Sequence, residues 1–206
     1  MTITLNKAGK KFYREWIFRN LDLTLEPGAK LVILGPNGSG KSTLLQILSG
    51  ATGLTEGQIK YNSNSTEISV DEIYHSISIS APYLELIEEF TLEEIIHFHF
   101  KFKKAKNNLS EAEVLNLSGL ESKKDKVFKF FSSGMKQRIK LTLAILSDTS
   151  ILLLDEPCSN LDSEVVKWYQ EMIRKYAMDR TIIVASNNQK EEFGFCDKQI
   201  SIDDLK

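Results

Sequence analysis

One short stretch, GPNGSGKS at residues 35–42, constrains the fold of this chain more than any other. It fits the pattern G-x-x-x-x-G-K-[ST], follows the apolar run LVILG, which predicts a buried strand, and precedes STLLQILSG, which predicts a helix start. In that order the glycines let consecutive backbone N–H groups face inward, and the helix N-terminus adds further free N–H groups. The alternative is a glycine-rich turn without a ligand. The flanking strand and helix favour a phosphate site.

The residue types within this loop fit a nucleotide with its metal ion. Lys41 supplies a point charge for the outer phosphates, and the Ser42 hydroxyl suits Mg²⁺. We therefore predict that the loop binds the nucleotide through Gly35, Pro36, Asn37, Gly38, Ser39, Gly40, Lys41, Ser42 and Thr43.

Composition narrows the classes of protein that fit. The chain has 206 residues, enough for one domain with a substantial core, and its net charge of −2 gives no electrostatic reason to expect a nucleic-acid partner. Cys158 and Cys196 lie far apart without metal-ligand spacing, so we expect reduced cytosolic thiols. No apolar run approaches the roughly 20 residues of a membrane helix, so any work at a membrane would need a partner.

The N-terminal part predicts two half-buried antiparallel strands, over residues 2–5 and 18–25, because apolar and polar residues alternate there. Between them lie Phe12, Tyr13 and Trp16. An aromatic ring at this place suits stacking on an adenine, whereas the simpler interpretation is a strand end that packs on its sheet. These residues alone favour the simpler interpretation.

The middle of the chain changes from strands to helices. Residues 53–62 predict a turn and a strand, residues 62–66 a polar surface loop, and residues 76–82 a strand. From Thr91 onward, apolar residues recur at helical spacing, and Thr91 with Glu94 matches a capping box. Further helical patterns cover residues 109–117 and begin again at Phe130, so the sequence predicts a helix-rich insert.

SILLLDEP, at residues 150–157, predicts a buried parallel strand with Asp155 and Glu156 at its carboxyl end, where open α/β sheets bind ligands. A helix over 164–176 and strands over 181–186 and 198–202 follow. We therefore expect an α/β fold, a P-loop NTPase core with a mostly parallel sheet, an N-terminal antiparallel β subdomain and a helical insert. The expected single domain spans residues 1–206, with 1–90 and 132–206 as the core and β subdomain and 91–131 as the helical subdomain.

Several motifs in order resemble the ATP-binding subunit of ABC transporters, over essentially the whole chain. They are GPNGSGKS, the helical insert, FSSGMKQR at residues 131–138, ILLLDEP, and SNLD at residues 159–162. FSSGM stands where the family has LSGGQ: Ser132 and Gly134 match, whereas Phe131, Ser133 and Met135 depart. Without its neighbours FSSGM would be an ordinary helix start with a serine cap, but its place between the other motifs favours the signature.

The resemblance implies a role for each motif. Asp155 and Ser42 would hold Mg²⁺, and Glu156 would orient or deprotonate the attacking water. Two subunits, identical or different, would sandwich two ATP molecules head to tail. The γ-phosphate on one subunit's loop would then be capped by the other's Ser132, Ser133, Gly134 and Met135. Phe12, which lies six residues before Phe18, would stack on the adenine, with Tyr13 as the fallback.

Two positions depart from the family where it has catalytic side chains. Ala81 stands in place of a glutamine that touches Mg²⁺, so water or Glu85 would have to substitute. Asn187 stands in place of a histidine that contacts the γ-phosphate, and asparagine donates hydrogen bonds but does not titrate near neutral pH. We expect nucleotide binding to be kept and turnover to be slower or differently regulated.

The expected function is that of an ATP-binding subunit that hydrolyses ATP to ADP and phosphate and drives a separate membrane permease, from the inner face of the cell membrane. One alternative is a weakly hydrolysing ATP-binding regulatory protein, which the two departures favour. Others are a non-transport member of the superfamily and a small-molecule kinase, although a kinase has no use for FSSGMKQR or SNLD. The substrate and the direction of transport would be set by the membrane partner.

Overall fold

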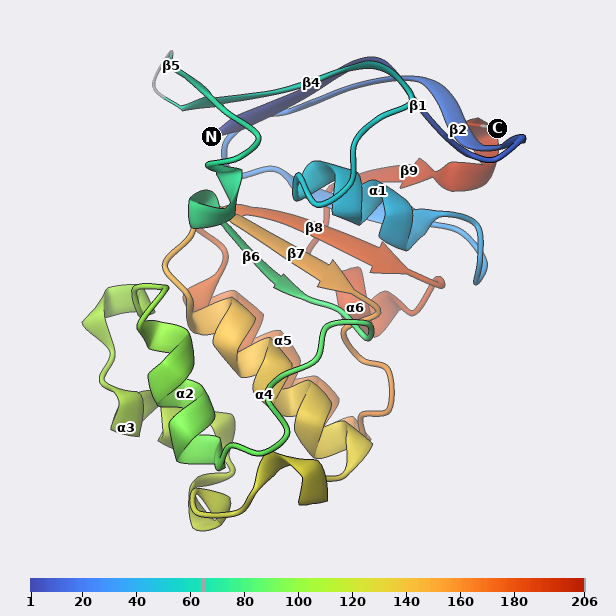
Figure 1. The fold of residues 1–206 in the computed structure, drawn as a ribbon. Helices are drawn as coiled ribbons and strands as arrows, with labels where there is room; N and C mark the ends of the chain where they lie inside the picture. Colours follow the sequence, from blue (N-terminus) through green and yellow to red (C-terminus); the bar gives the residue numbers. More distant parts are fainter. Residues whose placement is uncertain (64–65, 206) are drawn as a thin grey trace.

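The computed structural model describes residues 1–63 and 66–205. Two β-sheets and a layer of helices are stacked on one another (Figure 1). The antiparallel sheet has the order β2 (Glu15–Leu25), β1 (Thr2–Phe12), β4 (Glu56–Ser63) and β5 (Thr66–Ile68). The parallel sheet has the order β6 (Ile77–Ser80), β7 (Ile151–Asp155), β8 (Thr181–Ser186), β3 (Lys30–Leu34) and β9 (Lys198–Ser201). The predicted α/β fold class is thereby confirmed.

The helices cover both faces of the parallel sheet. Helix α1 (Lys41–Leu48) lies between the two sheets, whereas α4 (Ser133–Leu146) and α5 (Ser163–Tyr176) lie on the opposite face (Figure 1). Helix α2 (Leu92–Phe100) packs against α3 (Glu111–Ser118), which in turn packs against α4, and the short α6 (Lys190–Phe193) follows β8. Within residues 1–63 and 66–205, no helix has the length and apolar character needed to cross a membrane.

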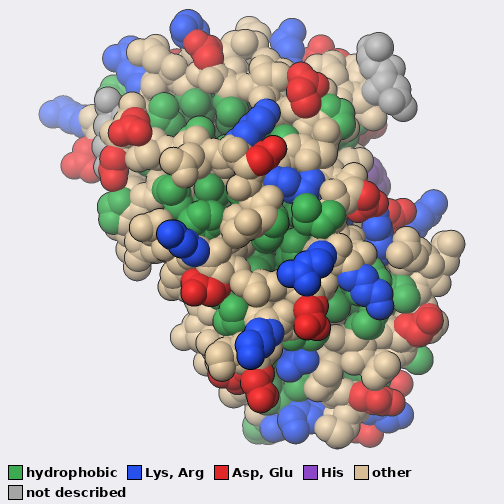
Figure 2. Space-filling model, turned by 180° about the vertical axis from the view of Figure 1, so that it is seen from behind, with side chains coloured by type: hydrophobic (Ala, Val, Ile, Leu, Met, Phe, Trp, Pro, Cys, Tyr) green, Lys and Arg blue, Asp and Glu red, His purple; other side chains and the backbone are tan. Residues whose placement is uncertain are grey.

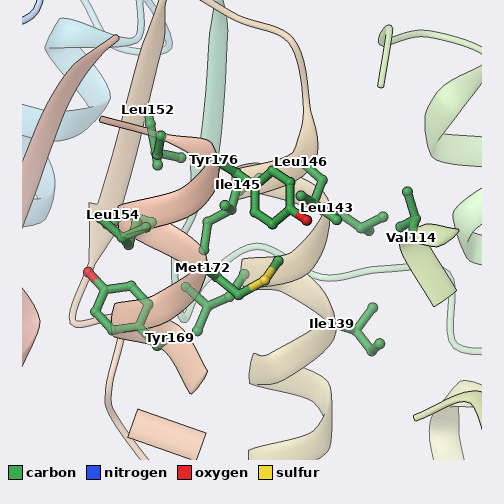
Figure 3. Close-up of a cluster of buried hydrophobic side chains, with 14 of the residues drawn as sticks. Val114, Ile139, Leu143, Ile145, Leu146, Leu152, Leu154, Tyr169, Met172 and Tyr176 are labelled. Carbon is green, nitrogen blue, oxygen red and sulfur yellow. The ribbon is translucent and has the colours of Figure 1, made fainter. Parts of the chain in front are cut away.

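The parallel sheet carries a hydrophobic core on each face. Along β7, Leu152 and Leu154 point toward Tyr169 and Met172 of α5 (Figure 3), whereas Leu153 faces the α1 side. This alternation follows from the two-residue period of a strand. Because both faces are covered, all residues of β7 and β8 are buried, which explains the unbroken apolar runs in the sequence.

The antiparallel sheet differs from its prediction in length. Strand β1 continues to Phe12, and β2 begins at Glu15, so most of the stretch predicted to connect them is paired strand. Register shifts between Leu5 and Ala8 interrupt the two-residue alternation, which is why the pattern in the sequence ends early. The polar loop predicted over 62–66 is partly strand, since β4 extends to Ser63 and β5 begins at Thr66, and residues 64 and 65 lie outside the described residues.

Side-chain caps define the helices of the insert. The predicted capping box of α2 is confirmed: the Glu94 N–H donates to Thr91 Oγ1 at 3.2 Å, and the Thr91 N–H donates to Glu94 Oε2 at 2.8 Å. Ser110 forms an equivalent box with Glu113 at the start of α3, which the sequence analysis missed. The helix predicted from Phe130 begins instead at Ser133, because residues 128–130 form a 3₁₀ turn.

The surface on the far side of the molecule has no single sign of charge. On the face shown in Figure 2, acidic and basic side chains are interspersed over both the upper and the lower part. Hydrophobic side chains show between the charged ones, in the upper part and across the middle of this face (Figure 2). This mixture agrees with the small net charge of −2.

Candidate functional site

The loop between β3 and α1 has the backbone of an anion-binding turn. Gly38 has φ 79° and Gly40 has φ 112°, both in the left-handed region that favours glycine. A Cβ on Gly40 would lie 2.0 Å from Ile17 Cγ2, so β2 packs directly against the loop. Gly40 also forms the N-cap of α1, and no side chain of the described residues caps that helix. The first N–H groups of α1 are therefore free to bind a ligand.

Lys41 lies inside this loop as a buried cation. Its side chain is 4% exposed. Its Nζ donates to the carbonyl oxygens of Gly35 at 2.9 Å and Pro36 at 3.1 Å, and Glu156 Oε1 lies 3.6 Å away. The two hydrogen bonds go to neutral carbonyls and the Glu156 carboxylate lies at the long end of ion-pair distance, so phosphate oxygens would be stronger partners.

Asp155 ends β7 as a buried carboxylate without a hydrogen-bond partner. Its side chain is 2% exposed, and neither Oδ atom accepts a hydrogen bond of normal geometry from a described residue. Burial raises the pKa of this carboxyl above its ordinary value, and nearby Ser42 and Lys41 offset part of that rise. An ionised carboxylate is costly in such a place unless a cation compensates it.

The Asp155 site fits a hard divalent cation such as Mg²⁺, because carboxylate and hydroxyl oxygens are its preferred ligands. Within the described residues, no three or more His, Cys, Asp and Glu side chains are grouped so that they could hold a metal ion without other ligands. An ion at Asp155 and Ser42 would therefore share its coordination with phosphate oxygens and water, as Mg²⁺ commonly does in nucleotide sites.

Glu156 begins the loop after β7 in a strained conformation. Its φ is 45°, which is uncommon for a residue with a side chain and costs about 1–2 kcal/mol. Its N–H donates to the Ala185 carbonyl at 2.9 Å, and its carbonyl accepts from the Ser159 N–H at 3.0 Å. These bonds direct the carboxylate toward Lys41. A strained backbone that places a carboxylate beside a phosphate loop agrees with a catalytic role for Glu156.

The segment after β6 places Tyr83 near Asp155, and not Glu85 as the sequence suggested. Ala81 is fully buried, and its carbonyl accepts a hydrogen bond from Lys140 Nζ at 3.0 Å. Glu85 lines a 240 Å³ groove away from the loop, with Leu86 and other apolar residues. The nearby polar side chain is that of Tyr83, whose pKa is raised first by burial and further by the Asp155 carboxylate. Sequence reasoning missed Tyr83, because no motif includes it.

The remaining predicted residues are Asn187, the aromatic pair Phe12 and Tyr13, and the signature residues 132–135. Asn187 is exposed directly after β8. Phe12 and Tyr13 lie at the end of the β1–β2 hairpin and are 46% and 101% exposed, so neither is packed into the sheet as the simpler interpretation required. Ile17, further along β2, reaches the phosphate loop at Gly40.

Ser132 is the N-cap of α4, and its Oγ accepts from the Met135 N–H at 3.3 Å. Ser132 and Ser133 are exposed, whereas a Cβ on Gly134 would lie 2.9 Å from the Asn160 carbonyl oxygen. The SNLD segment thus packs closely against the start of α4. In Figure 1 this helix and α1 lie on opposite faces of the parallel sheet.

Comparisons with known proteins agree with this geometry. The profile of the family described as ABC transporter matches residues 18–159. The sulfate/thiosulfate import ATP-binding protein CysA of Nitrosomonas europaea is 29% identical, over 96% of this chain and 57% of its own length. The Fe(3+) ions import ATP-binding protein FbpC of Fusobacterium nucleatum is 26% identical, over 96% of this chain and 54% of its own. The chain thus spans a little over half the length of these relatives.

Among solved structures, the fold resembles the ATP-binding cassette MJ0796, solved as a dimer in a post-hydrolysis state bound to ADP and Pi. The TM-score is 0.80 at 24% identity, and the match covers 97% of this chain and 93% of the other. A putative ABC transporter ATP-binding protein from Pyrococcus furiosus matches with a TM-score of 0.81 at 19% identity and full coverage of both chains. These likenesses concern the fold.

Proposed function

The chain belongs to the ABC transporter family, and on this premise we propose that it is the ATP-binding subunit of such a transporter. It hydrolyses ATP to ADP and phosphate. The observation that carries the proposal is the buried, unpaired carboxylate of Asp155, at the end of the strand next to Glu156 and close to Ser42 of the phosphate loop. Ser42 and Lys41 offset only part of the cost of burying that carboxylate, and a cation brought with the nucleotide would compensate it further.

Binding follows from the loop. The free N–H groups at the start of α1 donate to the outer phosphate oxygens, and Lys41 exchanges its carbonyl partners for them. Ser42 and Asp155 would hold Mg²⁺, which when bound would neutralise charge on the phosphates. Phe12, exposed at the hairpin end, stacks on the adenine.

Hydrolysis follows from Glu156. Its carboxylate orients a water molecule and accepts the water proton as the new bond to the γ-phosphorus forms. The bond between that phosphorus and the oxygen bridging to the β-phosphate breaks, and ADP leaves with the electron pair. The fixed backbone of Glu156 supports this role, because a positioned base does not need to reorganise during the reaction.

The reactive site is completed by a second subunit in a head-to-tail dimer. Since α1 and α4 lie on opposite faces of the parallel sheet (Figure 1), Ser132 to Met135 face another subunit's nucleotide rather than their own. The exposed hydroxyls of Ser132 and Ser133 and the N-terminus of α4 supply donors for that γ-phosphate.

A separate permease docks at the helical insert, residues 91–131, and holds the protein at the inner face of the membrane. The groove beside the insert is lined by Leu86, Ile87, Phe90, Phe98 and Phe102, and Phe98 and Phe102 are 41% and 69% exposed. Large exposed aromatic side chains mark an interaction surface. The names of the two import relatives support a permease partner.

Turnover is slower than is usual in the family. Ala81 offers no polar side chain, and Asn187 supplies a hydrogen bond without a titrating group. Asn187→Ala should lower kcat about tenfold, since one hydrogen bond to a charged phosphate is lost. Unchanged phosphate release in that variant would remove Asn187 from the mechanism.

The test of the function is phosphate release by the purified protein, alone and with its permease. Glu156→Gln keeps the shape of the side chain and removes the base, so it should bind ATP, stop hydrolysis and accumulate as an ATP-bound dimer on gel filtration. A hydrolysing Glu156→Gln variant, or a wild-type protein that binds ATP without releasing phosphate, contradicts the proposal. The second result would favour the weakly hydrolysing regulatory alternative.

A further inference from the structure

Glu192 is a buried carboxylate for which the proposed reaction has no role. Its side chain, on α6, is 1% exposed. Oε2 accepts a hydrogen bond from Ser186 Oγ at 2.5 Å, and Oε1 accepts one from the backbone N–H of Cys158 at 3.0 Å. The two oxygens therefore join the last residue of β8, where the next loop begins, to the loop that follows the neighbouring strand β7.

Both partners stand next to residues proposed to face the γ-phosphate. Cys158 lies two residues after Glu156, and Ser186 directly precedes Asn187. The bond from the Glu156 N–H to the Ala185 carbonyl, at 2.9 Å, is a second link between the same two segments. Glu192 thus fixes the spacing of two loops that must act on one phosphate.

The two loops need such a restraint. Glu156 and Asn188 have φ 45° and 61°, in the left-handed region that residues with side chains adopt rarely. Backbone of this kind persists only where the surroundings hold it. The Ser186 hydroxyl adds to the restraint, because it also accepts from the Gln189 N–H at 3.2 Å.

The charge of Glu192 is balanced by hydrogen bonds rather than by an ion pair. No Lys, Arg or His within the described ranges lies within salt-bridge distance of its carboxylate. Burial raises the pKa of Glu192, the bonds from Ser186 and Cys158 act against that rise, and the Glu156 and Asp155 carboxylates add to it. Both carboxylate oxygens have a hydrogen-bond partner, which offsets part of the cost of burying this side chain.

We propose that Glu192 is a positioning residue for ATP hydrolysis, whose carboxylate holds the loops after β7 and β8 so that Glu156 and Asn187 meet the same γ-phosphate. The inference rests on the proposed hydrolysis. It states that Glu192, a residue outside the family motifs, sets the relative position of Glu156 and Asn187. It predicts that loss of the link affects the chemical step and leaves ATP binding at the phosphate loop intact, since that loop is held by β3 and α1.

The chain offers a matched control on the same residue. The Tyr169 hydroxyl donates to the backbone carbonyl of Glu192 at 2.8 Å, on a fully buried side chain. Tyr169→Phe removes a buried hydrogen bond to Glu192 but leaves both carboxylate bonds in place. It should lower Tm and leave kcat unchanged.

The experiment measures kcat and KM for ATP, together with Tm, in Ser186→Ala, Glu192→Ala, Glu192→Gln and Tyr169→Phe. Ser186→Ala and Glu192→Ala should lower kcat by about 10- to 100-fold, because displaced catalytic groups lose their alignment. KM should stay within about threefold. Glu192→Gln should keep most of the activity, since its amide oxygen accepts from Cys158 and its NH₂ donates to the free lone pair of Ser186 Oγ.

Wild-type kcat in Ser186→Ala, or a loss confined to KM, overturns the role of Glu192 while hydrolysis itself stands. A Glu192→Gln variant as inactive as Glu192→Ala also overturns it. If Glu192→Ala does not fold, Ser186→Ala decides. A wild-type protein without hydrolysis overturns the proposed function and this inference together.

Discussion

Helices α1 and α4 both begin at residues proposed to meet a phosphate, yet their N-termini are built differently. The N-cap of α1 is Gly40, with φ 112° and no side-chain hydrogen bond from the described residues, whereas Ser132 caps α4 by accepting from the Met135 N–H. An N-terminus without a cap has its donors free for a ligand, while a capped one has already used one of them. The difference agrees with the proposal that α1 binds nucleotide within one subunit, whereas α4 donates to the nucleotide of a second subunit.

Among these variants, removal of the Lys41 charge at the uncapped N-terminus of α1 should have the largest effect on ATP binding. Lys41→Ala should raise the Kd for ATP by about 100-fold or more, because charge-assisted bonds to the outer phosphates are lost. Isothermal titration of the isolated protein measures this, with Tm as the control for folding. ATP binding within threefold of wild type would mean that the backbone donors of α1 suffice alone.

Removing the cap of α4 should separate binding from closure. Ser132→Ala should leave ATP affinity in the monomer unchanged and lower phosphate release by about 100-fold, because a donor to the transferring phosphate is lost. Gel filtration with ATP in a Glu156→Gln background should show less dimer. If Lys41→Ala and Ser132→Ala weaken ATP binding by the same factor in the monomer, the two termini do not differ as proposed.

Asp155 lies on the α1 side of the site and gives a further test of it. Its buried carboxylate would bind a cation, but without one it lowers the stability of the nucleotide-free protein. The raised folded-state pKa means that ionised Asp155 opposes folding: the penalty is absent below the unfolded pKa and grows as pH rises through the folded pKa. Asp155→Asn should therefore stabilise the nucleotide-free protein by about 1–3 kcal/mol at pH 7. The gain should vanish near pH 3, and Mg²⁺-dependent hydrolysis should be lost.

Urea unfolding of both proteins without nucleotide or Mg²⁺, at several pH values, measures the difference. A variant no more stable than wild type at pH 7 would show that Asp155 has a partner in the free protein.

Removal of the cap of α2, a helix without a proposed ligand, should have the smallest effect on the protein. Thr91→Ala removes the cap of α2 and should lower the free energy of unfolding by about 1 kcal/mol. ATP affinity and phosphate release without the permease should not change. If this variant impairs hydrolysis as strongly as Ser132→Ala, loss of a cap alone explains both, and α4 has no special role.

The strand and helix on either side of GPNGSGKS were predicted correctly, because the motif joins three consecutive elements and needs no distant contact. The parallel strands were also predictable, since both of their faces are buried and their apolar runs are continuous. The ends of β1 and β2 were missed where register shifts break the alternation.

Two polar residues near the site left no local signal. Tyr83 approaches Asp155 only through the turn after β6, and no spacing rule links the two. Glu192 lies in the run Lys190, Glu191, Glu192, which is typical of an exposed helical face, yet it is buried through partners 6 and 34 residues away in the chain. Burial of this kind depends on the tertiary fold, which a single sequence read locally does not contain.

The order of strands in the parallel sheet has a consequence for synthesis of the protein. Strand β3, which leads into the phosphate loop, pairs with β8 and β9 and with no other strand of residues 1–63 and 66–205. Lys30 therefore pairs with Ile182, and Leu31 with Lys198, only after those later residues have been synthesised. At translation rates of about 5–20 residues per second, roughly 8 to 30 seconds separate the two emerging from the ribosome. A nascent chain therefore has the GPNGSGKS motif long before β3 has its partner strands, and we expect ATP to stabilise only chains in which β8 and β9 have been made.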